Sequence, residues 1–189
     1  MTLSQIFARP FAAVAVFSAL VLLSPDLSRA ADMPASGAEL RIGAAYHGYE
    51  GREAGTADVS VDALLPAFDL GKSFTSESFS LHPQLGLDAN TQGKTSAAFA
   101  GFAAIVHLPA RFKIEADLGG SINDGKTTSL DSGRAELGCN ALFREALGLG
   151  YQLTKQLSVM AVAEHMSNAN ICQPNNGLTN FGIKLGYSF

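Results

Sequence analysis

The alternation of apolar and polar side chains along residues 39–189 is the feature that most limits the fold of this chain. In the segment 112–118, even positions are apolar, whereas Lys113, Glu115 and Asp117 occupy odd positions. A period of two puts the two sets on opposite faces of a strand, and no convincing helical period accompanies it. Turn residues separate eight such segments. They predict strands at residues 40–46, 59–65, 81–89, 96–108, 112–118, 137–151, 157–166 and 181–189.

Eight amphipathic strands suit two architectures, which differ in where the apolar face lies. A soluble sandwich or lipocalin-like barrel buries that face, whereas a transmembrane barrel turns it towards lipid and fills its lumen with polar or small residues. The polar face here mixes both signs of charge with many glycines, as a small packed lumen requires. We therefore expect an all-β fold, an eight-stranded antiparallel transmembrane β-barrel of the bacterial outer membrane. The segment 96–108 is apolar on both faces, so its sides are not assigned. The expected luminal charges are Arg41, Asp62, Lys113, Glu115, Asp117, Arg144, Glu164 and Lys184.

Residues 1–30 are typical of a secretory signal peptide. An apolar run from Phe11 to Leu23 precedes Ser28-Arg29-Ala30, which ends in a small-x-small cleavage pattern. The run is too short to span a membrane as a helix. Cleavage near Ala30 would leave residues 31–189 as the barrel and change the net charge from −4 to −5, because two arginines leave with one aspartate. Such a chain lacks the basic surface that nucleic-acid binding requires.

The connections between the expected strands alternate in length. Those at Pro109–Arg111 and Gln152–Lys155 are tight. Because outer-membrane barrels have short periplasmic turns and longer outer loops, both termini are expected in the periplasm. The last strand, with Tyr187 and Phe189 on one face, also resembles the C-terminal assembly signal of such barrels. The long connections are 48–57, 120–135 and 167–177, together with 66–79, which departs from the pattern.

His165 and Ser167 come two residues apart, where the seventh strand is expected to reach the outer leaflet. They share the parity of the apolar residues of that strand, so both should face lipid. On position alone, this is also the arrangement of an interfacial histidine and a loop serine. The tight turn before this strand puts His165 opposite Phe143 or, one register away, opposite Glu145. A lipid-facing acid is costly unless it has a role or lies above the hydrocarbon, and beside a histidine it can stabilise the charged imidazole.

Cys139 and Cys172 are expected to form a disulfide, because an exported chain passes through an oxidising compartment. The same strand register puts Cys139 opposite Ala169, close in sequence to Cys172. The bond would tether the loop after Ser167 and contribute about 3–4 kcal/mol. The alternative is a pair of reduced, buried thiols. A metal pair is disfavoured, because no further spaced ligands accompany the cysteines.

The stretch His165-Met166-Ser167-Asn168-Ala169, followed by Gln173-Pro174-Asn175-Asn176-Gly177, resembles the C-terminal signature of the outer-membrane lipid A 3-O-deacylases (PagL-type, also described as acyloxyacyl hydrolase-like). The resemblance covers the last quarter of the chain, and upstream only the barrel pattern supports it. It implies an eight-stranded barrel with a site on its outer wall. It also implies an esterase that removes the 3-O-linked acyl chain of lipid A and needs no metal or cofactor.

By position, the resemblance implies Ser167 as the nucleophile, His165 as the general base, and Asn168 and Asn175 as oxyanion-binding groups. The family places a glutamate as the acid fourteen residues after the histidine, where this chain has Thr179. A threonine can hydrogen-bond an imidazole but cannot offset its positive charge. Three outcomes stay open: the dyad works slowly, Glu145 supplies the acid, or the protein is a non-catalytic relative.

The main hypothesis is an ester hydrolase that acts on lipid A, or lipopolysaccharide, in the outer leaflet, with Glu145 orienting His165. The rival is a structural small barrel resembling surface antigens, in which His165 and Ser167 tolerate substitution. A soluble lipocalin-like carrier is a third interpretation. The expected partners are lipid A and the outer membrane, with no nucleic acid, and a homodimer is compatible with the sequence.

Overall fold

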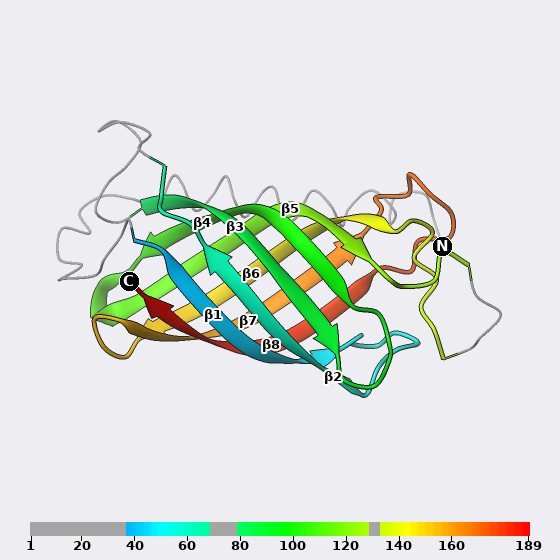
Figure 1. The fold of residues 1–189 in the computed structure, drawn as a ribbon, viewed down its shortest axis with the longest axis horizontal. Coiled ribbons are helices and arrows are strands. Elements are labelled where there is room, and N and C mark those ends of the chain that lie inside the picture. The colour runs from blue at the N-terminus through cyan, green and yellow to red at the C-terminus, as the bar shows by residue number, and fades with distance from the viewer. Residues whose placement is uncertain (1–36, 69–78, 129–132) are drawn as a thin grey trace.

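A closed barrel of eight antiparallel strands makes up the described part of the computed structural model, residues 37–68, 79–128 and 133–189 (Figure 1). Each strand pairs with its neighbours in the chain, and β1 pairs with β8 to close the barrel. The predicted fold class is confirmed. The strands are β1 (Glu39–His47), β2 (Thr56–Leu64), β3 (Phe79–Asn90), β4 (Ala97–His107), β5 (Phe112–Asn123), β6 (Ala141–Gln152), β7 (Leu157–Ser167) and β8 (Leu178–Ser188), with a short 3-10 turn, η2 (Pro109–Arg111), before β5.

Two of the predicted segments fall wholly or mostly on residues that the structure does not describe. The expected signal peptide, residues 1–30, and most of the connection 66–79 lie outside the described residues. Among the residues that are described, no helix is long and apolar enough to cross a membrane.

The alternation in sequence becomes an apolar outer wall and a polar lumen. Along β6, the outward side chains Phe143, Leu147 and Leu149 are each at least half exposed, whereas Arg144 between them is buried. On β4, whose sides the sequence left open, the buried Phe99 marks the odd positions as luminal. An apolar wall facing outwards excludes the sandwich and lipocalin-like alternatives, which require the apolar face inside.

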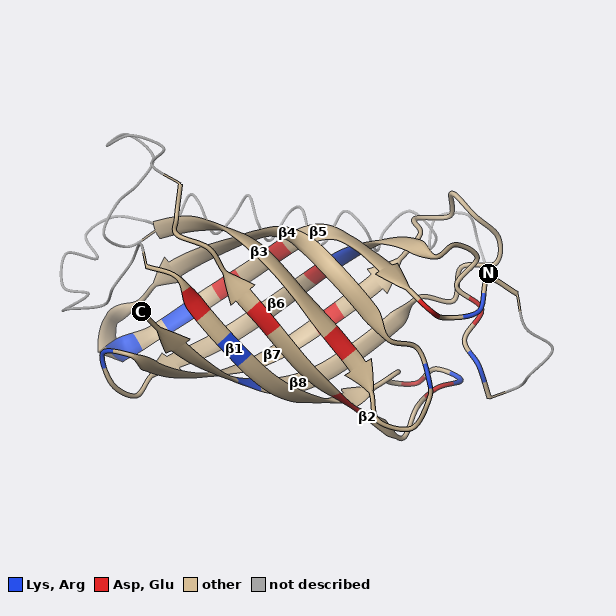
Figure 2. Cartoon of the chain, viewed as in Figure 1, with Lys and Arg blue, Asp and Glu red and all other residues tan. Residues whose placement is uncertain are grey.

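All eight predicted luminal charges are buried, and Figure 2 shows charged residues distributed along the strands of the barrel. Arg41 is the centre of one network: its Nε lies 2.6 Å from Glu39, and its two terminal nitrogens lie 2.5 and 2.7 Å from the Glu115 oxygens. Lys184 lies 2.8 Å from Asp62. Buried charges are tolerated only when they are paired and hydrogen-bonded, so these contacts fill the lumen rather than leave a pore.

The start of the sixth strand was predicted wrongly. The alternation predicts a strand that starts at residue 137 with Leu137 towards lipid, but β6 begins at Ala141. Gly138 has a φ of +73°, a left-handed conformation that ends the extended run and turns the chain across the barrel mouth. Leu137 is therefore completely buried and packs with Met166 and Leu178. Apolar residues happen to alternate with polar or small residues in this loop, so the pattern of the strand continues beyond its first residue.

Glu53, in the loop between β1 and β2, ties three outer loops to the barrel. Its carboxylate lies 2.9 Å from His47 Nε2, and it accepts hydrogen bonds from the Thr95 and Ala135 main-chain N–H groups at 2.9 and 3.1 Å. The Arg134 guanidinium adds an ion pair at 3.0 Å. Burial alone would raise the pKa of Glu53, but the hydrogen bonds from His47 and the main chain outweigh burial and lower it to about 2.

This pKa predicts an acid-sensitive set of outer loops. A depressed folded-state pKa means that the contribution of Glu53 is complete above its ordinary pKa of 4.5 and is lost as pH falls towards about 2. Between pH about 6 and about 3, the melting temperature of the wild type should fall by on the order of 2–4 °C more than that of Glu53→Gln, which has no such carboxylate to protonate. Thermal unfolding followed by circular dichroism measures both. Parallel pH curves for the two proteins would contradict the assignment.

Candidate active site

His165 lies in β7 between Glu145 of β6 and Thr179 of β8, because the three residues pair directly across neighbouring strands. Of the two registers that the sequence allows, the one with Glu145 is formed. His165 Nδ1 lies 2.8 Å from Thr179 Oγ1, a hydrogen-bond distance. Ser167 ends β7 opposite Phe143, whose ring faces outwards. The histidine and the serine therefore share the outer wall, as their parity predicts.

Gly177 packs against the other edge of the His165 ring. It directly precedes β8 and has a φ of +63°. A Cβ placed on it would lie 2.9 Å from His165 Cε1 and 3.3 Å from Nε2. Only glycine combines this backbone conformation with so close an approach. The imidazole is consequently held on two sides, by the Thr179 hydroxyl at Nδ1 and by the Gly177 backbone along the edge that carries Nε2.

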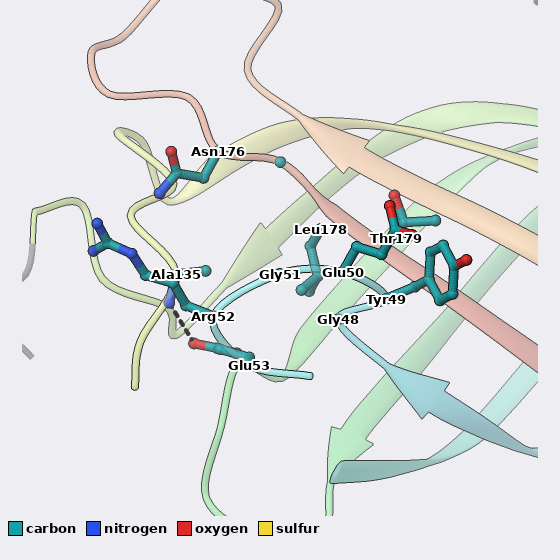
Figure 3. A pocket seen from close by; sticks show the side chains of 11 residues that line it. Gly48, Tyr49, Glu50, Gly51, Arg52, Glu53, Ala135, Asn176, Leu178 and Thr179 are labelled. Carbon is teal, nitrogen blue, oxygen red and sulfur yellow. Dashed lines mark hydrogen bonds between the residues drawn. The ribbon is translucent and has the colours of Figure 1, made fainter. Parts of the chain in front are cut away.

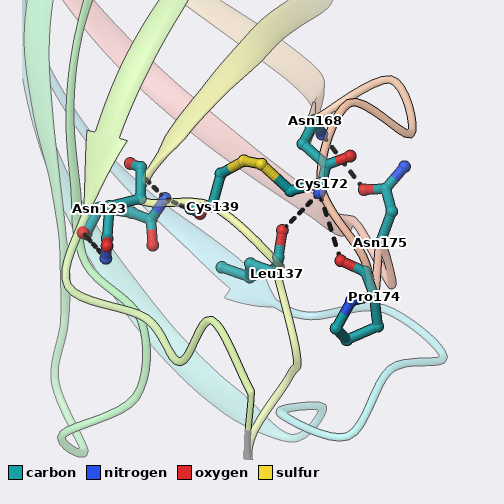
Figure 4. The surroundings of a disulfide bond; sticks show 8 residues. Asn123, Leu137, Cys139, Asn168, Cys172, Pro174 and Asn175 are labelled. Carbon is teal, nitrogen blue, oxygen red and sulfur yellow. Dashed lines mark hydrogen bonds between the residues drawn. A yellow bond between two sulfur atoms is a disulfide. The ribbon is translucent and has the colours of Figure 1, made fainter.

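The loop after Ser167 is held by Asn168 (Figure 4). The Asn168 side chain is buried, and its Nδ2 donates to Leu137 O at 2.7 Å and to Pro174 O at 3.3 Å. Its main-chain N–H donates to Asn175 Oδ1 at 3.2 Å. Thus the two asparagines implied as oxyanion-binding groups contact each other beside Ser167, but the Asn168 side-chain nitrogen is occupied by two carbonyls.

Two further residues of this loop adopt left-handed backbone conformations. Ala169 and Asn170 have φ values of +51° and +65°, although both carry a Cβ. Such conformations cost of order 1–3 kcal/mol each and persist where the surrounding structure imposes them. The strain begins two residues after Ser167, and this turn sends the chain away from the barrel wall.

The expected disulfide is present. Cys139 and Cys172 are bonded, with their Cα atoms 5.9 Å apart, and they join the loop before β6 to the loop after Ser167 (Figure 4). The register that suggested the bond is different, since Phe143 rather than Ala141 pairs with Ser167 and Cys139 precedes the strand. The crosslink nevertheless restrains the segment in which Asn168 and Asn175 lie.

Glu145 is half-buried on the outer wall directly opposite His165. Among the described residues, its carboxylate takes part in no hydrogen bond or ion pair with a protein side chain. Glu164, the other acid near His165 in sequence, faces the lumen and lies 2.6 Å from Arg144. Glu145 is thus brought beside the histidine without being bonded to it.

A cavity of about 330 Å³ lies on the β8 side of His165 (Figure 3). Its walls include Gly177 and Thr179, which both contact the imidazole, and the loop after β1. That loop is attached to β8 because Tyr49 N donates to Thr179 O at 2.7 Å. The loop contributes Tyr49, Glu50 and Arg52 to the cavity.

No pattern in the sequence points to these loop residues. They carry no motif, and they reach His165 only because β1 and β8 close the barrel. Gly177 was quoted as part of the C-terminal signature, but its contact with the imidazole ring was not foreseen. The closure of an eight-stranded barrel was the one available signal, because it makes the first outer loop a neighbour of the last strand.

Comparison with known proteins decides the family. The sequence model of the lipid A 3-O-deacylase (PagL) family matches residues 41–188, almost the entire barrel. This chain belongs to that family. A search of curated protein sequences found no match. The family is one of ester hydrolases, and its membership together with the barrel assigns the protein to the outer membrane.

Solved structures agree on the fold. The crystal structure of the outer membrane enzyme PagL is similar with a TM-score of 0.60 and 17% identity, over 80% of this chain and 99% of that one. A de novo designed transmembrane β-barrel gives a TM-score of 0.52 at 12% identity, covering 84% and 99% of the two chains. Neisserial surface protein A gives 0.50 at 12% identity, covering 82% and 98%. At such identities the likeness concerns the barrel alone, so the function of this lipid A 3-O-deacylase family member depends on its own residues.

Proposed function

We propose that the protein is an active lipid A 3-O-deacylase in which Ser167 is the nucleophile and His165 the general base. The observation that carries the proposal is the double support of the His165 ring, by Thr179 at Nδ1 and by Gly177 beside Nε2, with Ser167 two residues further along the same face. A base oriented through one ring nitrogen has the other nitrogen for the nucleophile. A histidine that merely faces lipid needs neither support.

The height of the site along the barrel wall suits lipid A, whose acyl chains and sugars need an apolar and a polar environment respectively. Below it, outward residues of β8 such as Phe181, Ile183 and Leu185 form part of the exposed apolar wall, where acyl chains would lie. Above it are the polar outer loops. An ester between a sugar and an acyl chain would lie at the boundary between these two environments, beside Ser167.

The reaction would follow acyl transfer chemistry. Ser167 Oγ attacks the ester carbonyl carbon, forming a C–O bond while its proton passes to His165 Nε2. The tetrahedral intermediate then collapses, the bond to the sugar 3-oxygen breaks, and His165 returns the proton to that oxygen. Water, deprotonated by the same histidine, attacks the acyl-serine and releases the fatty acid and the free serine.

The oxyanion would be bound by the groups that meet beside Ser167. We assign this role to the Asn175 side-chain amide and to the main-chain N–H of Asn168, because the Asn168 side chain is committed to Leu137 and Pro174. The Asn168 N–H donates to Asn175 Oδ1 at 3.2 Å, and Asn175 Nδ2 donates to Asn170 Oδ1 at 3.4 Å, so both donors are in long hydrogen bonds for which a developing negative charge can compete. The disulfide and the buried Asn168 side chain keep the loop in place.

Thr179 would orient the imidazole, and Glu145 would offset its charge from the β6 side. The Thr179 hydroxyl can accept the Nδ1 proton but carries no charge, whereas the Glu145 carboxylate faces the same wall opposite His165. Glu145→Gln should therefore reduce kcat by less than about tenfold, since no direct hydrogen bond is lost. Full activity in this variant would remove Glu145 from the mechanism.

The proposed activity is tested by mass spectrometry of lipid A from cells that express the protein. The spectrum should show loss of one ester-linked hydroxyacyl chain relative to cells with empty vector. Unchanged lipid A, in cells where the barrel is folded and heat-modifiable on gels, would favour the rival structural barrel. The observation that favours this rival is Thr179 in place of an acid. N-terminal sequencing of the same protein tests the proposed removal of residues 1–30.

Gly177 supplies a test of the site geometry. Gly177→Ala forces the His165 ring to move by several tenths of an ångström, and misplacing a catalytic group by about 1 Å can cost about a hundredfold. We expect kcat to fall by about ten- to a hundredfold. Gly93→Ala is the matched control, because Gly93 has a similar φ of +74° but no atom near its Cβ position. Equal activities of the two variants would contradict the role of Gly177.

A further inference from the structure

The loop that carries Glu50 is rigidly attached beside Thr179. Gly48 N donates to Asn180 Oδ1 at 2.9 Å, and Tyr49 N donates to Thr179 O at 2.7 Å. At the other end of the loop, the buried Glu53 is bound by His47 and by two neighbouring loops. The backbone position of Glu50 is therefore determined by the start of β8.

Glu50 adopts a backbone conformation that disfavours its residue type. Its φ is +56°, in the left-handed region, where a side chain other than that of asparagine, aspartate or glycine is uncommon. The next residue, Gly51, would tolerate such a conformation more easily. Strained non-glycine residues cluster at functional sites, so the direction in which Glu50 points needs an explanation.

The side chain of Glu50 lies on the same side of the barrel wall as the histidine. The cavity of about 330 Å³ is lined by Glu50 as well as by Gly177 and Thr179 (Figure 3). The ring of Tyr49 packs edge-on against Phe181, with centroids 5.1 Å apart, and Phe181 follows Thr179 on the outward face of β8. The neighbouring Glu50 carboxylate also raises the pKa of the Tyr49 phenol.

Two walls of the cavity are the two groups that hold His165. Thr179 Oγ1, when it accepts the Nδ1 proton, keeps its own hydrogen for a further acceptor. Among the described residues, Glu50 and Thr179 are not directly hydrogen-bonded, but the cavity between them is polar and large enough for a bridging water. Glu145 is on the opposite flank, on the β6 side, whereas Nδ1 is engaged on the β8 side.

We propose that Glu50 is a second carboxylate that stabilises the charged form of His165, acting across the cavity through the Thr179 hydroxyl on the side opposite Glu145. The inference rests on the proposed deacylase function and names a positioning residue that, together with Glu145, compensates for the missing acid. Glu50 does not touch the substrate in this scheme. It stabilises the imidazolium that forms while Ser167 attacks, so its effect should be on kcat and on the acidic limb of the pH–rate profile.

The decisive comparison is Glu50→Asp against Glu50→Asn in the purified full-length barrel, with lipid A in detergent micelles as substrate and released hydroxy fatty acid as readout. Both side chains suit a left-handed backbone and have nearly the same shape, so they differ only in charge and in one acceptor oxygen that becomes a donor nitrogen. We expect Glu50→Asn to have a kcat about ten- to a hundredfold below that of Glu50→Asp. Its acidic limb should move to lower pH, because a less stabilised imidazolium has a lower pKa.

Rescue distinguishes positioning from a structural role. Thr179→Glu places a carboxylate directly against Nδ1. Combining it with Glu50→Asn should therefore restore both the kcat and the pH at which the acidic limb of the rate profile falls. Glu136→Gln removes another outer-loop carboxylate, which pairs with Arg52 at 3.2 Å, and should leave both unchanged. Equal kcat values for the Asp and Asn variants, or no rescue by Thr179→Glu, would overturn the role of Glu50 while Ser167→Ala stays inactive. An inactive wild type would overturn the deacylase function as well.

Discussion

Ser167→Ala is expected to abolish lipid A deacylation while leaving the barrel intact. Removing the nucleophile of a serine hydrolase costs at least about 10³-fold in kcat, since only oxyanion binding and substrate binding remain. Ser167 ends β7 on the outer wall and its hydroxyl supports no described element of the fold. Release of hydroxy fatty acid by the purified variant measures the effect, and its melting temperature should remain within about 2 °C of wild type.

The matched control for this variant is Ser96→Ala. Ser96 also lies at the outer end of the barrel, next to the first residue of β4, and its hydroxyl accepts only a loop hydrogen bond from Asn90 N at 3.0 Å. It should retain full activity. Comparable losses in both variants would mean that the outer loops tolerate no change there, and the nucleophile assignment would fail.

Arg41→Met should be the most destabilising single change in the lumen. Arg41 is 1% exposed and lies within 4 Å of three carboxylates, those of Glu39, Asp62 and Glu115. Methionine fills similar volume but leaves the acids without their cation, and breaking a buried ion network typically costs about 3–5 kcal/mol. Urea unfolding in detergent, followed by the mobility shift of the folded barrel on gels, measures the loss.

A compensating change checks the cause of that loss. Arg41→Met combined with Glu115→Gln removes one positive and one negative charge together, so part of the stability should return. Leu40→Val alters the adjacent lipid-facing position and should cost about 1 kcal/mol or less. An unfolding midpoint for Arg41→Met equal to that of wild type would show that the luminal network contributes little to stability.

The catalytic question for this family member concerns the charge on His165. Threonine at position 179 preserves the hydrogen bond to Nδ1 but removes the negative charge that a glutamate would supply there. Carboxylates flank the histidine on both sides, Glu145 across β6 and Glu50 across the cavity. The rescue by Thr179→Glu therefore separates loss of charge at this position from loss of the whole mechanism.

Most of the fold was predictable because successive side chains of a strand point to opposite faces, so the apolar and polar pattern shows which face each residue occupies. The eight luminal charges, the outward His165 and Ser167, and the disulfide between Cys139 and Cys172 all agree with the sequence analysis. Each follows from a period of two or from the residue type alone. The prediction failed at Leu137, where alternation continued into a loop and Gly138 turned the chain inwards.

The chain by itself determined the number of strands and the side on which most strand residues lie, and the family resemblance related position 179 to His165. Barrel closure decided the rest. It joined Gly48 to Asn180, 132 positions away, and so brought Glu50 to the cavity beside Thr179. It also set the distance from Gly177 to the imidazole and turned the Asn168 amide towards Leu137. Local patterns encode which face a residue occupies, whereas contacts between loops depend on how the two ends of the sheet meet.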